Sequence, residues 1–140
     1  MWTNQVQYLG VYLVSSKAFS CNYDLTKKFF YRAFTTIYGK VGKLAHVIIE
    51  LFNTKCMPIS LYGLDACPVS PRQLKSLNHV VISCGRKIFD VKTSELAAEC
   101  LRMFGVSDVA DAMAGHKDRF VDRYALMSSV ICEICTIINQ

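Results

Sequence analysis

The pattern of apolar and polar positions changes its period near residue 22. Gln5 to Val14 is rich in β-branched and aromatic residues, and Ser15 to Lys17 offers a turn before the short segment Ala18 to Cys21. Such runs, broken by small polar residues, are typical of paired strands. The first 21 residues are therefore predicted to form a β-hairpin.

From Tyr23 to Tyr38 the apolar residues recur at helical spacing. Asn22 is placed to cap the start of this helix, and Gly39 to end it. One half of the helical wheel is apolar and the other polar: Leu25, Phe29, Phe30, Ala33, Phe34 and Ile37 lie on the first, and Lys27, Lys28, Tyr31, Arg32 and Thr35 on the second. An amphipathic helix with its apolar half in the core is expected.

Further helices are predicted between residues 44 and 92. Leu44 to Leu64 has a helical apolar series in which Pro58 should cause a kink or a break, because proline lacks an N–H and clashes with the preceding turn. Ser70-Pro71-Arg72-Gln73 has the residues of a capping box with proline at the first helical position, so a helix should begin at Pro71. Gly85 inside that helix costs about 1 kcal/mol relative to alanine.

The last third of the chain predicts two short helices and a long one. Glu95 to Phe104 is amphipathic and closed by Gly105, and a brief helix should run from Ser107 to Gly115. His116 to Asn139 is predicted to be a core-facing final helix, on a stripe formed by Phe120, Tyr124, Met127, Ile131, Ile134 and Ile138. The expected fold is mainly α: a short N-terminal β-hairpin (1–21), a basic helical bundle (22–92) and a C-terminal helical extension packing on it (93–140), with about five or six helices in all.

Composition supports a folded domain with a basic surface. The 140 residues are 52% apolar and 19% charged, which is enough to bury a core. Residues 1–92 hold 12 Lys and Arg against 4 Asp and Glu, and residues 93–140 hold 4 against 7, giving +8 and −3 and the net +5. A basic first part is expected of a protein that binds a polyanion.

The polar half of the first helix is the strongest candidate for that binding. Lys27, Lys28 and Arg32 surround Tyr31, and Lys40 and Lys43 follow in a glycine-containing segment. Cations in a row can contact phosphates while an aromatic ring rests on a sugar or base. An ordinary lysine-rich surface is the alternative. Gly39 to Lys43 lacks the spacing of a nucleotide-binding P-loop, and by itself it is equally well an ordinary solvated turn.

No catalytic set or metal site is expected. The two-metal chemistry of polymerases needs paired aspartates, and the sequence has no Asp-Asp pair. Asp108 with Asp111 and Asp118 with Asp122 are better explained as solvated surface, at a helix start and among basic residues respectively. The seven cysteines are expected to be reduced, buried thiols, Cys132 and Cys135 included, because no second pair completes a zinc site. No cofactor, no metal and no independent enzyme activity are predicted.

The chain is expected to act inside the cell, in cytoplasm or nucleus, and without a membrane. It opens with polar residues rather than a secretory signal. Its longest nearly uncharged stretch, Tyr124 to Ile138, contains Glu133 and is too short to span a bilayer.

An ordered series of short segments resembles the region beyond the palm in the reverse transcriptases of jockey-like LINE elements, a group of non-LTR retrotransposons. The segments are Tyr8-Leu9-Gly10-Val11, Phe30-Tyr31-Arg32-Ala33-Phe34, Tyr38 to Leu44, Thr54 to Pro58, Leu61 to Pro68, Lys75 to Leu77 and Lys87 to Phe89. They cover nearly the whole chain in the order found in that family, where a Leu-Gly hairpin is the primer grip and the helices after it form the thumb.

The resemblance implies a non-catalytic, thumb-like part of an RNA-directed DNA polymerase that holds an RNA–DNA or DNA duplex. Tyr8, Leu9 and Gly10 would form the primer grip, and the cations from Lys27 to Lys43 would contact the duplex backbone. The palm and fingers of the parent polymerase would be further partners, and the chain is expected to be a truncated copy. The alternative from a different class is a helical module for self-association or protein binding with no nucleic-acid role.

Overall fold

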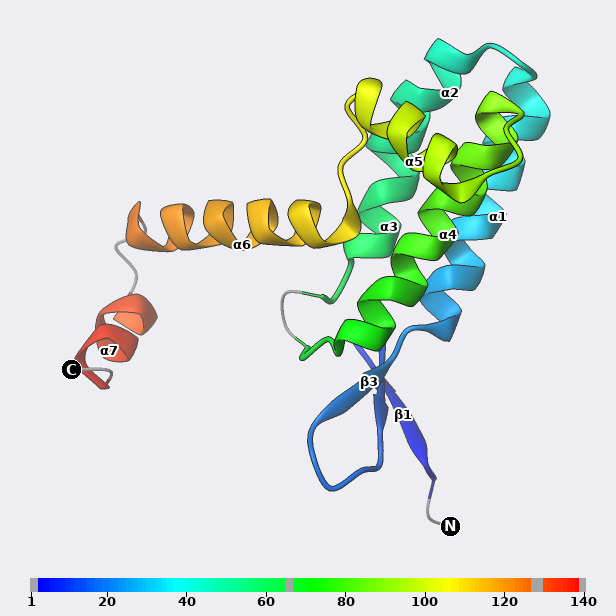
Figure 1. Cartoon of the computed structure of the whole chain (residues 1–140). Helices are drawn as coiled ribbons and strands as arrows, with labels where there is room; N and C mark the ends of the chain where they lie inside the picture. The colour runs from blue at the N-terminus through cyan, green and yellow to red at the C-terminus, as the bar shows by residue number, and fades with distance from the viewer. Residues whose placement is uncertain (1–2, 65–66, 127–129, 139–140) are drawn as a thin grey trace.

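The computed structural model describes residues 3–64, 67–126 and 130–138, without the side chains of residues 130–132. It confirms a mainly α-helical chain with a short antiparallel sheet at its N-terminus. Figure 1 shows the sheet below a bundle of helices, with the last helices extending to one side.

The sheet has three strands, β1 (Gln5–Tyr8), β2 (Val11–Val14) and β3 (Ser20–Asn22), paired in that order. The single strand expected over Gln5 to Val14 is therefore two strands. They are joined by the two-residue turn Leu9–Gly10, with φ of 47° and 81°. Positive φ at both central residues is typical of a type I′ turn, which favours glycine at its second position but rarely has leucine at its first, so this turn was not predicted.

Helix α1 (Asp24–Val41) buries Phe30 and Phe34. The N-cap residue is Tyr23 and not Asn22 as predicted, but the Asn22 side chain still accepts a hydrogen bond from the N–H of Asp24, the first residue of the helix (2.9 Å). The helix does not end at Gly39 as expected but runs to Val41, because helical hydrogen bonding continues until Gly42 at φ 71°.

At Pro58, where a kink or a break was expected, the helical path does not break but is widened just before the proline. Helix α2 (Ala45–Leu51) passes into a π-helical segment, η1 (Phe52–Cys56), and then into α3 (Met57–Leu61). Proline has no N–H to donate in either kind of helix, and its ring crowds the carbonyl four residues before it; the wider π turn gives the ring room without ending the helix. Phe52, at the start of the widened turn, is fully buried and meets Phe30 and Phe34 edge to face.

Helix α4 (Pro71–Phe89) begins where it was predicted. Ser70 Oγ accepts from the Gln73 N–H (3.2 Å) and Gln73 Oε1 accepts from the Ser70 N–H (3.0 Å), which completes the capping box. Helix α5 (Ser94–Met103) packs across α4 at Gly85. A Cβ there would lie 2.6 Å from Leu101 Cδ1, so the glycine that weakens the helix lets α5 approach.

The C-terminal prediction is wrong in two respects. Gly115 does not end a helix, because α6 runs through it from Val109 to Leu126, and α7 (Val130–Ile138) is separate. The expected core-facing stripe is exposed, with Phe120 66% and Ile138 75% accessible, while Met127 and the Ile131 side chain lie outside the described residues. The first three turns of α6 lie against the bundle, where Val109 is buried and the residues up to Arg119 line a pocket with Met57 and Leu61, and the rest points away (Figure 1). The extension thus packs on the bundle through α5 and the start of α6.

The core lies between α1, the α2–η1–α3 path, α4 and α5. Its largest fully buried side chains are Phe30, Phe34, Phe52, Ile48, Leu64, Leu77 and Val109. Cys21, Cys56, Cys67 and Cys84 are buried free thiols, as predicted, whereas Cys135 is exposed and the Cys132 side chain is not described. Burial raises the pKa of Cys56 to about 11 and, as the largest cause, that of Cys84 to about 12, so both remain neutral.

Candidate nucleic-acid interface

The cations of α1 do not all lie on one open face. Lys28, Arg32 and Lys40 are exposed, and Lys43 is exposed just beyond the helix end at Gly42. Lys27 is different: its side chain is only 25% accessible and its Nζ lies 3.2 Å from Asp24 Oδ1. Four of the five predicted cations are therefore free to meet a ligand.

Tyr31 was predicted on the polar half of α1 but is half-buried against the core. Seven residues further on, on the same side of the helix, Tyr38 Oη donates to the Lys87 carbonyl of α4 (3.4 Å). This side of α1 therefore faces α4. The sequence placed Tyr31 with the lysines because helical spacing cannot reveal that two neighbours, rather than one, pack on α1.

Helices α1 and α4 run side by side in the same direction (Figure 1). Near their starts, Gln73 Nε2 donates to the Cys21 carbonyl (2.9 Å), and near their ends Tyr38 bonds to Lys87. Each of these two hydrogen bonds joins residues about fifty positions apart in the sequence. Together they align the helices along most of their length.

A second row of cations on α4 was missed in the sequence. Arg72, Lys75, Arg86 and Lys87 are all exposed, and α4 contains no acidic residue. On α1 the only acidic residue is Asp24, which pairs with Lys27. The signal that would have found this row is a 19-residue helix with four cations and no carboxylate.

The predicted primer-grip residues lie at the tip of the β1–β2 hairpin. Tyr8 and Leu9 are exposed, at 65% and 74%. The tip is held against the residue that follows α3, because Tyr62 Oη donates to the Leu9 carbonyl. A Cβ at residue 10 would lie 3.1 Å from the Tyr62 ring, so glycine fits both this close contact and the φ of 81°.

A groove of about 830 Å³ connects the hairpin with α1. Gly10 and Arg32 both line it, so the structure brings together one residue from each part of the predicted site. Lys55, from η1, is a second cation on the groove that the sequence did not single out, and none of the lining residues is acidic. The groove is otherwise mostly apolar or aromatic, being lined also by Val11, Tyr12, Tyr23, Leu25, Phe29, Ala33, Ile37, Pro58, Ile59 and Tyr62.

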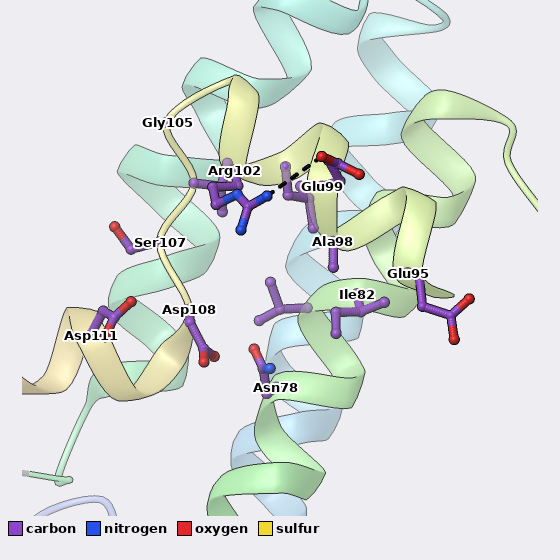
Figure 2. A pocket seen from close by; sticks show the side chains of 13 residues that line it. Asn78, Ile82, Glu95, Ala98, Glu99, Arg102, Gly105, Ser107, Asp108 and Asp111 are labelled. Atoms are coloured by element: carbon purple, nitrogen blue, oxygen red, sulfur yellow. Dashed lines mark ion pairs between the residues drawn. The ribbon is translucent and has the colours of Figure 1, made fainter. Parts of the chain in front are cut away.

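Carboxylates gather elsewhere, on the side of α4 that carries α5. Figure 2 shows Glu95, Glu99, Asp108 and Asp111 around a pocket of about 540 Å³ between α4, α5 and the start of α6. Arg102 Nη2 lies 3.5 Å from Glu99 Oε1. Within the described ranges, no three His, Cys, Asp or Glu side chains are grouped so as to hold a metal ion.

Comparison of the chain with family models, with curated proteins and with solved structures finds no match. None of the described helices is long and apolar enough to cross a membrane. The function must therefore be inferred from the chain's own residues.

Proposed function

We propose that the chain is a non-catalytic, thumb-like nucleic-acid-binding module of the reverse-transcriptase type, acting inside the cell. It binds an RNA–DNA or DNA duplex through phosphates along the outer surfaces of α1 and α4. The observation that carries this proposal is the pair of aligned helices with exposed cations on both and a single, already paired carboxylate.

The dimensions suit a duplex. At a rise of about 1.5 Å per residue, the 18 residues of α1 and the 19 of α4 each span roughly 27 to 29 Å. Phosphates follow one another by about 3.4 Å along each strand, so such a surface reaches across about eight base pairs. Contacts of this kind fix the position of a duplex and carry little sequence preference.

The hairpin supports a more specific role. The resemblance to jockey-like LINE reverse transcriptases implies that Tyr8, Leu9 and Gly10 form a primer grip, and Gly10 lines the same groove as Arg32. The strand end would lie at the tip while the duplex follows the helices. The palm and fingers of a polymerase would supply the chemistry, since the described residues include no group of three or more His, Cys, Asp or Glu side chains that could hold a metal ion.

Fluorescence anisotropy with a hybrid, a DNA duplex and single strands tests the proposal. Four to six phosphate contacts predict that log affinity falls with log salt at a slope of about −4 to −5. Lys28→Ala and Lys75→Ala, one on each helix, should each weaken binding and reduce the slope by about 1. Lys117→Ala, an exposed cation on α6, is the matched control and should change neither. A salt-independent affinity, or no binding at low salt, would refute the proposal.

A further inference from the structure

The groove beside the hairpin is more apolar than phosphate contact requires. Phe29 and Tyr62, on its two sides, keep 50% and 58% of their surface accessible. Water in contact with such side chains is unfavourable, and open apolar surfaces of this kind commonly receive a partner. Arg32 and Lys55 give the groove a positive charge with no carboxylate to balance it.

Helix α7 also has an exposed apolar side, but its charge is negative. Ile134, Ile137 and Ile138 are spaced at i, i+3 and i+4, which places them on one side of the helix, and they are 50%, 71% and 75% accessible. Glu133 adjoins this side and is the only charged residue of α7. The helix thus presents an apolar face with a negative charge at its edge.

We propose that α7 of one copy of this chain binds in the groove of a second copy, and reciprocally, so that the protein forms a symmetric dimer. The isoleucines would cover Phe29 and Tyr62, and Glu133 would lie at the rim with Arg32 and Lys55. Apolar surface meets apolar surface, and the charges at the edges are opposite.

The geometry favours a second copy over the groove of the same chain. Helix α6, 18 residues and about 27 Å long, is rooted in the bundle only by its first turns and carries α7 away from it (Figure 1). An extended arm that ends in an apolar face, together with a receiving groove on the same molecule, is the arrangement that gives reciprocal exchange between two copies.

The oligomeric state tests this directly. Light scattering of the full chain across a range of concentrations should show a dimer, and Ile137→Asp should raise the dimer dissociation constant at least tenfold. Met103→Asp also replaces an exposed apolar side chain by aspartate, at an 80% accessible position of α5, and should leave the dimer intact. A monomeric wild-type chain, or a dimer that tolerates Ile137→Asp, would overturn the proposal.

Cross-linking shows where α7 binds. Thr36 lines the groove and Thr35 does not, although both are exposed and each hydroxyl bonds to the carbonyl four residues earlier. Mild oxidation of Thr36→Cys should link the new thiol to Cys135 of another copy, identified by peptide mapping, while Thr35→Cys should not. Equal linkage in both variants would refute binding in the groove.

The dimer and the nucleic-acid interface can each be tested with a variant that leaves the other in place. Ile137→Asp should still bind duplex, because every cation of α1 and α4 is kept; loss of the dimer uncovers Arg32, so the salt slope should steepen by no more than about 1. Lys75→Ala should weaken duplex binding and leave the dimer intact.

Discussion

Replacing Gly85 by alanine tests how closely α5 packs on α4. The new Cβ would lie 2.6 Å from Leu101 Cδ1 and 2.9 Å from Leu101 Cγ, whereas carbon atoms in contact normally lie about 3.5 to 4.0 Å apart. Leu101 is only 3% accessible, so it has little space to move. Overpacking of this kind costs about 1 to 3 kcal/mol, and alanine regains roughly 0.5 to 1 kcal/mol of helix propensity. The free energy of unfolding should fall by about 1 kcal/mol.

Gly39→Ala is the matched control. Gly39 also lies in a helix, α1, but a Cβ there meets no atom within 4 Å. Only the propensity gain remains, so this variant should be more stable by up to about 1 kcal/mol. The two substitutions are chemically identical and should have opposite signs.

Urea unfolding followed by far-UV circular dichroism measures both changes. With a denaturant slope of about 1 to 3 kcal/mol per molar, 1 kcal/mol moves the midpoint by roughly half a molar. In a Leu101→Ala background the clash is removed, so Gly85→Ala should no longer destabilise, which reports the coupling of the pair. If Gly85→Ala stabilised the wild-type chain as Gly39→Ala does, α5 would not pack on α4 at this distance.

Two further predictions concern the hairpin and the buried thiols. Leu9→Asn should raise the free energy of unfolding by about 0.5 to 1 kcal/mol, because asparagine tolerates the φ of 47° at the first position of a type I′ turn and Leu9 is exposed; a lower thermal midpoint would contradict this. The free energy of unfolding should be constant up to pH 9.0 and then fall as pH rises toward 11 to 12, because folding raises the thiol pKa of Cys56 and Cys84 above the unfolded value. The urea midpoint, measured from pH 7 to 11, should fall less steeply in Cys84→Ala than in the wild-type chain. A flat profile in the wild-type chain would refute the reasoning.

The features of the fold that were predicted correctly are those that depend on neighbouring residues in the sequence. The start of α4 depends on four consecutive residues whose side chains bond to each other's backbone, so Ser70 to Gln73 defines it without help from the rest of the fold. The burial of Phe30 and Phe34 follows from helical spacing alone. Gly105 ends the α5 region for the same local reason, since it supplies a positive φ of 78°.

Features that depend on distant partners were missed. A helical wheel divides α1 into two halves, but the bundle covers a wider arc and takes Tyr31 and Lys27 partly out of solvent. Gly115 resembles a helix end, yet helical hydrogen bonding continues through it. The stripe containing Phe120 has the spacing of a core helix, but α6 leaves the bundle before that residue meets the core.

The candidate site was found in part for the same reason. The cations of α1 are close in sequence, so they form a visible cluster. Those of α4 are spread over a segment about fifty residues away, and α4 is brought beside α1 only by contacts between distant segments, such as Gln73 to the Cys21 carbonyl. Lys55 joins Arg32 on the groove only because η1 continues the helical path past Pro58.

Charge segregation in the folded chain gives the proposed interface a direction. Eight of the 12 cations of residues 1–92 lie on α1 and α4, and four of the seven carboxylates of residues 93–140 line the pocket between α4, α5 and α6. A phosphate backbone would be attracted to the first and repelled by the second, so a duplex would be oriented before it makes contact. Because long-range fields are screened within about 10 Å at 0.1 M salt, this orientation acts on the association rate mainly at low ionic strength, whereas the direct contacts of residues such as Lys28 and Lys75 determine how long the duplex stays bound.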